Sequence, residues 1–141
     1  MLDKLTNFSI AVSSIDEAAD YYAKMFGVKM MRVIPNPSHY GFQAAWMGDG
    51  ETAFIELLEP TDPEGAVARF LKSRGGGVYM VSFDVPDLAE AVRHVRANGG
   101  RITGIPDDEE PGPNTNVVWV HPSTTMGVFV QLQRPGRGVL E

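Results

Sequence analysis

The chain has 141 residues, 43% of them apolar, no cysteine, and a formal net charge of −6 at pH 7. This length is enough to bury a core in one compact domain or in two closely packed half-domains. The acidic balance and the scattered Lys and Arg residues argue against a nucleic-acid partner. The lack of cysteine excludes disulfides, thiolate catalysis and Cys-ligated metals. No segment has the character of a membrane span or a signal peptide, so we expect a cytoplasmic protein without a membrane partner.

The first half of the chain carries the signals of one strand, one helix and three further strands. Ser14-Ile15-Asp16-Glu17 has the capping-box pattern that begins a helix, and Gly27 suits the left-handed position that ends one. Before this helix, apolar and polar residues alternate as in a half-buried strand. The predicted elements are a strand at 5–12, a helix at 15–26, and strands at 28–34, 41–47 and 52–58.

The second half repeats this order of elements. The segment NFSIAVSSIDEAADYYAKMFG, from Asn7 to Gly27, is similar to MVSFDVPDLAEAVRHVRANGG, from Met80 to Gly100, both in its strand and in the apolar stripe of its helix. A helix at 64–73 and three glycines at 75–77 separate the halves. The predicted elements of the second half are a strand at 78–85, a helix at 87–98, strands at 101–105, 116–120 and 127–133, and a solvated acidic loop at 106–114.

The repeat indicates a tandem duplication. The fold class we predict is α+β, with two β-α-β-β-β modules forming a curled mixed sheet around a central cup. The predicted boundaries are 1–62 for the first module, 63–77 for the linking helix and Gly-rich joint, 78–135 for the second module, and 136–141 for a flexible tail.

Strand alternation predicts which side chains face the cup. The helices cover one face of each half-sheet, so the other face must line the cup. Apolar walls with a few converging polar groups are typical of a small-molecule site, but the same aromatic side chains could equally form a core between the sheets. Besides Glu56, the residues predicted to bind a ligand are Asn7, Ser9, Trp46, Phe54, Met80, Ser82, Trp119, Phe129 and Gln131.

Several segments together resemble the vicinal oxygen chelate superfamily, which contains glyoxalase I, extradiol dioxygenases, fosfomycin-resistance enzymes and bleomycin-binding proteins. These segments are IAVSSIDEAADYYAKMFGV, FIELLEP and VWVHPSTTMGVFVQL. ELLEP and ARFLKSRGGGVYMVSFDV make the methylmalonyl-CoA epimerase branch the most similar. The resemblance covers residues 5–133 and implies a glyoxalase-like fold, a small-molecule ligand and a homodimer.

The same resemblance implies a metal site, but its ligands differ here. In the epimerase branch the metal is held by a His on the first strand, a Gln or Glu ending the first half, a His on the repeated strand and a terminal Glu. The corresponding residues are Asn7, Glu56, Met80 and Gln131. Amides coordinate weakly and a thioether prefers soft metals, so only Glu56 suits a hard divalent cation. We therefore expect that the metal centre is lost and that the protein uses no cofactor.

Two residues are candidates for proton transfer. Glu56 lies among apolar neighbours on its strand, which should raise its pKa and suit it to act as a general base. A purely structural hydrogen bond to Asn7 or Gln131 is the alternative. His39 aligns loosely with the second carboxylate of the epimerase pair and could transfer a proton near pH 7, or it could be an ordinary surface residue.

These residues leave more than one function open. The first is a metal-independent enzyme of the epimerase, isomerase, lyase or cyclase type, in which the amides of Asn7 and Gln131 polarise a carbonyl of a small organic or acyl substrate. The second is a non-catalytic protein that binds an aromatic or drug-like compound. The third is a metal-dependent, methylmalonyl-CoA epimerase-like enzyme with another ligand set, such as Glu56 with His39 or His121.

Overall fold

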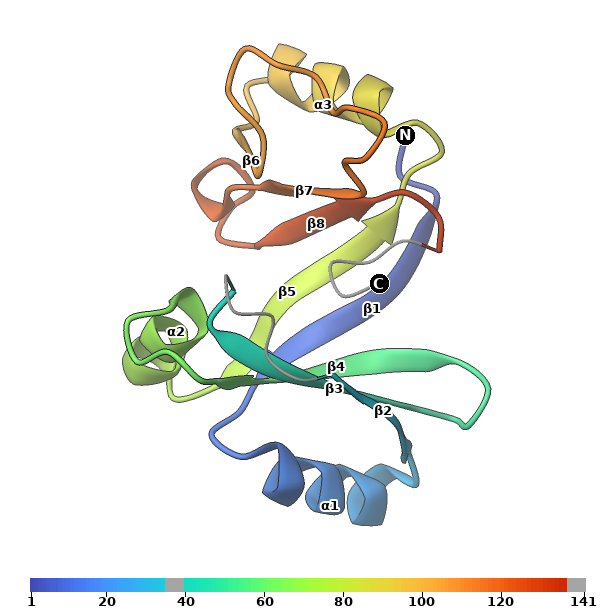
Figure 1. The fold of residues 1–141 in the computed structure, drawn as a ribbon, viewed down its shortest axis with the longest axis vertical. Coiled ribbons are helices and arrows are strands. Elements are labelled where there is room, and N and C mark those ends of the chain that lie inside the picture. Colours follow the sequence, from blue (N-terminus) through green and yellow to red (C-terminus); the bar gives the residue numbers. More distant parts are fainter. Residues whose placement is uncertain (35–39, 137–141) are drawn as a thin grey trace. The chain divides into compact units, whose positions relative to one another are not determined.

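The computed structural model describes residues 1–34 and 40–136, and the β-α-β-β-β order occurs twice among them (Figure 1). The predicted α+β, glyoxalase-like fold class is therefore confirmed. The elements of the first half are β1 (Lys4–Ala11), α1 (Ile15–Phe26), β2 (Lys29–Ile34), β3 (Phe42–Gly48), β4 (Ala53–Pro60) and α2 (Ala66–Arg74). Those of the second half are β5 (Gly77–Asp84), α3 (Leu88–Ala97), β6 (Ile102–Thr103), β7 (Val117–Val120), the 3-10 turn η1 (Pro122–Thr124) and β8 (Val130–Gln133).

The chain divides into two compact units. The N-terminal unit is Asn7–Tyr79, and the C-terminal unit combines Met1–Thr6 with the residues from Met80 onward. The predicted first module began at residue 1, whereas this division places Met1–Thr6 in the C-terminal unit. Asp3 N donates to Asp84 O at 3.0 Å and Thr6 Oγ1 donates to Ser82 O at 3.0 Å, so the start of the chain runs beside β5.

In the N-terminal unit, β2, β3 and β4 are antiparallel neighbours, and the part of β1 in this unit pairs in parallel with β4. Helix α1 begins where Ser14 accepts a hydrogen bond from Glu17 N at 3.2 Å, and ends at Gly27 with a φ of 70°. Both features confirm the predicted helix bounds. Alternate residues of β1 and β4 pack with α1 on one face of the sheet. The buried members of this cluster are Ile10, Ile15, Val28, Ala45, Met47, Ile55 and Leu57.

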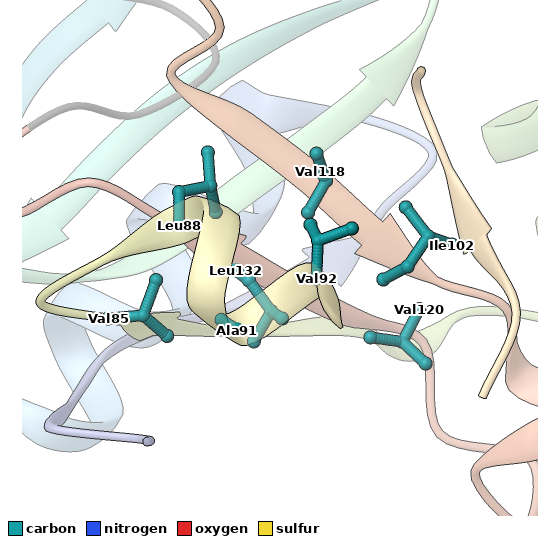
Figure 2. Close-up of a cluster of buried hydrophobic side chains, with 8 residues drawn as sticks. All are labelled: Val85, Leu88, Ala91, Val92, Ile102, Val118, Val120 and Leu132. Atoms are coloured by element: carbon teal, nitrogen blue, oxygen red, sulfur yellow. The ribbon is translucent and has the colours of Figure 1, made fainter. Parts of the chain in front are cut away.

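The C-terminal unit repeats this plan. Its strands lie in the order β5-β8-β7-β6, with β5 and β8 parallel and the other pairs antiparallel. Asp87 caps α3 by accepting from Glu90 N at 3.0 Å. Figure 2 shows one face of α3 packing its apolar side chains against the strands. The buried members of this cluster are Val85, Leu88, Ala91, Val92, Ile102, Val118, Val120 and Leu132.

The acidic loop after β6 is held against α3. Arg93 forms an ion pair with Glu110 at 2.9 Å, and the Arg96 guanidinium donates to the backbone oxygens of Glu109 and Pro106 at 2.5 and 2.9 Å. The loop is mostly exposed, as predicted, but arginine side chains fix its backbone. No helix among residues 1–34 and 40–136 is long and apolar enough to span a membrane.

Candidate functional site

Glu56 lies in the middle of β4, on the sheet face opposite α1. Its neighbours Ile55 and Leu57 point into the α1 cluster, so strand alternation turns Glu56 the other way. Its side chain is buried, with 6% exposure. Ser9 is its register partner on β1, and Ser9 Oγ donates a hydrogen bond of 2.5 Å to Glu56 Oε1. Sequence reasoning had placed Ser9 on this face without identifying it as the partner of Glu56.

Burial changes the acidity of Glu56. Removal from water disfavours the charged carboxylate and raises its pKa to about 7, an effect that the hydrogen bond from Ser9 partly opposes. This agrees with the rise expected from the sequence. A carboxyl group with such a pKa can both accept and release a proton near neutral pH.

The other predicted site residues of the N-terminal unit do not all lie near Ser9 and Glu56. Asn7 is buried two positions before Ser9 on β1, and Trp46 lies opposite Glu56 on β3. Phe54 packs against the α1 cluster. A surface hollow in this unit is lined by residues of α1, the end of β1 and the glycine joint, and contains none of the predicted site residues.

In the C-terminal unit, a chain of hydrogen bonds runs through the position equivalent to Glu56. Trp119 Nε1 donates to Gln131 Oε1 at 3.1 Å, and Gln131 Nε2 donates to Gln133 Oε1 at 2.8 Å. Gln133 Nε2 then donates to Asp84 Oδ1 at 3.0 Å. Asp84 and Gln133 were missed by sequence reasoning, although their alternation with Ser82 and Gln131 along β5 and β8 could have identified them.

The remaining predicted residues have separate positions. Ser82 is fully buried in register with Gln131, and Met80 is buried on the same face of β5. Phe129 is half-buried and lies just before β8, because the turn that contains Gly127 delays the start of that strand. His39 lies outside the described residues. His121 caps η1 by accepting from Ser123 N at 3.1 Å, which gives it a structural role.

Residues 4–127 match the model of the Glyoxalase/Bleomycin resistance protein/Dioxygenase superfamily. The chain belongs to this superfamily. It is 27% identical over 135 residues to mitochondrial methylmalonyl-CoA epimerase of Mus musculus. That alignment covers 94% of this chain and 74% of the relative. It is 28% identical over 128 residues to lactoylglutathione lyase of Escherichia coli O157:H7, covering 91% of this chain and 84% of the relative.

Among solved structures, methylmalonyl-CoA epimerase from Mycobacterium tuberculosis is similar to this chain with a TM-score of 0.79. The two sequences are 26% identical, and the match covers 96% of this chain and 90% of the other. The family and the epimerase branch suggested by the sequence are thus both supported.

These relatives overturn the expectation that the protein uses no cofactor. Methylmalonyl-CoA epimerases and lactoylglutathione lyases are the enzymes for which the resemblance implies a divalent metal. The prediction gave too much weight to the missing imidazoles. A hard cation can be held by one or two carboxylates together with water and substrate oxygens, so the loss of two His ligands does not exclude it.

The described side chains do not by themselves make a metal centre. Residues 1–34 and 40–136 contain no group of three or more His, Asp or Glu side chains that could hold an ion. One oxygen of Glu56 already accepts from Ser9. By themselves, the described side chains therefore do not form a preformed metal site.

Proposed function

We propose that this protein is an isomerase-type enzyme that moves a proton on the carbon next to a carbonyl group. The substrate class we propose is a small acyl thioester of the methylmalonyl-CoA kind, which agrees with the names of the epimerase relatives. The observation that carries the proposal is the buried carboxyl group of Glu56, held by Ser9 and without an ion-pair partner among the described residues.

The hydrogen bond from Ser9 gives the two oxygens of Glu56 different roles. Oε1 accepts from Ser9, whereas Oε2 makes no hydrogen bond to the described residues. Oε2 is therefore the atom that takes the proton from the α-carbon, and the electron pair of the broken C–H bond moves into the enolate of the thioester. A second acid, for which His39 is the predicted candidate, gives a proton to the opposite face of that carbon, and the enolate returns its electron pair to form the new C–H bond, which completes an epimerisation.

The remaining polar groups have supporting roles in this proposal. The amide of Asn7, on the same strand as Ser9, would polarise the thioester carbonyl. His39 stays a predicted second proton carrier, since it lies outside the described residues. The homodimer and the cytoplasmic location expected from the sequence also stay predictions.

The test is deuterium exchange at the α-carbon of methylmalonyl-CoA in D2O, followed by NMR, with added divalent cation and separately with EDTA. We expect wild-type protein to exchange this hydrogen, and Glu56→Gln to lower the rate by about 100-fold or more, because an amide cannot carry the proton. Glu51→Gln makes the same chemical change on the exposed β3–β4 hairpin and should leave the rate unchanged.

Two results would contradict the proposal. The first is a wild-type protein that exchanges no hydrogen under either condition. The second is a Glu56→Gln variant that exchanges at the wild-type rate, which would leave the carboxyl group without a part in the reaction.

A further inference from the structure

The surface hollow of the N-terminal unit is built from residues that the proposed reaction does not use. Its volume is about 410 Å³, which is within the range of small-molecule sites. β1 contributes Ile10 and Val12, α2 contributes Leu71, and α1 contributes one side of its first two turns. Neither Glu56 nor any other residue predicted to bind a ligand lines it. A molecule bound in this hollow would therefore occupy a second site.

The glycine joint keeps one wall of the hollow free of side chains. Gly75, Gly76 and Gly77 have φ values of 76°, 114° and 109°, in the region that other residues rarely adopt. A Cβ atom on Gly76 would lie 3.2 Å from Ala11 O, so this position is also crowded. The joint therefore requires glycine, and the wall that it forms consists of backbone alone.

Helix α1 presents one carboxylate and one open aromatic ring at the hollow. Glu17 and Tyr21 both line it, and their spacing of four residues makes them neighbours on one side of the helix. Glu17 forms no ion pair with the described residues. The Tyr21 side chain is 60% exposed and meets Tyr22 edge-on, with ring centroids 6.2 Å apart. A carboxylate and an aromatic ring both attract a cation.

No basic side chain of the protein supplies that cation. Among the described residues that line the hollow there is no Lys, Arg or His. Lys24, the one basic residue of α1, is held by Asp20 at 2.8 Å. The formal net charge of −6 adds a general attraction for cations. The charges around the hollow therefore favour a positively charged ligand over an anion.

We infer that this hollow binds a small organic cation, that is, an ammonium or guanidinium group attached to an apolar body. The cationic group lies between the Glu17 carboxylate and the Tyr21 ring. The apolar body lies against Val12, Ala18 and Leu71, which line the hollow beside them. This inference goes beyond the proposed isomerase function and does not rest on it.

Three probes of similar shape test the choice of a cation: phenethylammonium, neutral 2-phenylethanol and anionic phenylacetate. Methyl NMR of 13C-labelled protein reports on the hollow through Val12 and Ala18. We expect saturable shifts of both signals with phenethylammonium, and an affinity about threefold to fivefold higher than that of 2-phenylethanol. Phenylacetate should bind most weakly. Unmoved Val12 and Ala18 signals overturn the inference, and so does a cation that binds no more tightly than either of the other two probes.

A matched pair of variants tests the part of Glu17. Glu17→Gln removes the charge and keeps the shape, so it should weaken phenethylammonium binding about threefold to fivefold. Its affinity for 2-phenylethanol should be unchanged, which shows that the hollow is still formed. Asp16→Asn makes the same change of charge in the same turn of α1 but outside the hollow, and should alter neither affinity. Equal losses in the two variants would mean that only the overall charge matters, and would contradict the inference.

Two further positions test the ring and the space. Tyr21→Leu should weaken phenethylammonium binding about threefold, whereas Tyr21→Phe keeps the ring and should bind as the wild type does. Ser13 lines the hollow and is exposed, so Ser13→Trp should fill it and abolish the shifts at Val12 and Ala18. Wild-type binding in Ser13→Trp would place the probe elsewhere and reject this site.

The outcome is separable from that of the proposed reaction. The reaction is measured on methylmalonyl-CoA with variants of Glu56, and this site is measured on phenethylammonium with variants of Ser13, Glu17 and Tyr21. Failure of either proposal therefore leaves the other standing.

Discussion

The two halves of this protein carry the same backbone plan but treat equivalent polar positions in opposite ways. In the N-terminal unit, Ser9 donates to the carboxyl group of Glu56. In the C-terminal unit, Ser82 stands beside Gln131 and makes no such bond within the described residues. Register is identical in the two cases, so backbone geometry cannot explain the difference.

The cause lies two positions farther along each strand. After Ser9 and Glu56 come Ala11 and Leu58. Their side chains are apolar and cannot compete with Ser9 for a hydrogen bond to the Glu56 carboxyl group. After Ser82 and Gln131 come Asp84 and Gln133. Gln133 accepts from the Gln131 amide and donates to Asp84, which fixes the direction of both amides. A duplicated site can thus change its chemistry through its second neighbours while the strand pairing stays the same.

The tryptophans show the same divergence. Trp46 lies opposite Glu56, and Trp119 lies opposite Gln131. Within the described residues, an indole hydrogen bond across the strand pair is found only from Trp119. One half therefore retains a group that titrates, and the other holds a neutral amide in one orientation.

The largest effect we expect from making the halves alike concerns pH. Glu56 has a folded-state pKa of about 7 against an ordinary value of 4.5, so the folded state binds its proton more tightly than the unfolded state does. The resulting stabilisation is complete below about pH 4.5 and is lost as the pH rises through about 7. It amounts to about 3 kcal/mol.

Glu56→Gln removes this pH dependence, because an amide does not titrate. Urea unfolding between pH 4 and pH 8, in the presence of EDTA, should show wild-type stability falling relative to the variant as the pH rises. Parallel pH profiles for the two proteins would mean that folding does not shift the pKa of the Glu56 carboxyl group.

The reverse exchange, Gln131→Glu, should destabilise the C-terminal unit by about 1–3 kcal/mol at neutral pH. The new carboxylate and Asp84 are both acceptors, and the single amide of Gln133 between them can satisfy only one through its nitrogen. Denaturant unfolding measures the loss.

A second substitution checks this reasoning. Asp84→Asn offers a donor to the turned amide of Gln133, so the double variant should lose less stability than the sum of the two single variants. Strictly additive losses would show that the direction of the hydrogen-bond chain does not govern its energy.

Much of the fold could be read from the sequence. The capping pattern at Ser14 and the glycine at 27 fixed the bounds of α1, and strand alternation correctly turned Phe8 and Ile10 toward the helix. The shorter strands of the second half were overestimated. Gly104 and Gly127, with φ values of 96° and 91°, take conformations that end β6 and delay β8.

The site was harder to predict because the hydrogen-bond partners depend on side-chain directions. Alternation placed Ser9, Glu56, Ser82 and Gln131 on equivalent faces but could not tell which serine has an acceptor. That depends on where the Gln131 oxygen points, which in turn depends on Trp119 and Asp84. The expectation about metal failed for another reason: it was drawn from ligand types alone, and a hard cation does not require imidazole.

The sharpest contrast between the halves concerns the two serines, and Ser82→Ala has the smallest effect that we expect. Ser9→Ala removes a hydrogen bond to a buried carboxyl group and should cost about 1–3 kcal/mol of unfolding free energy. Ser82→Ala removes a buried hydroxyl that has no partner among the described residues, so it should leave stability unchanged or raise it by a fraction of 1 kcal/mol. Parallel urea titrations of the two variants measure the difference. A loss in Ser82→Ala as large as that in Ser9→Ala would mean that this hydroxyl is already satisfied in the folded protein without ligand.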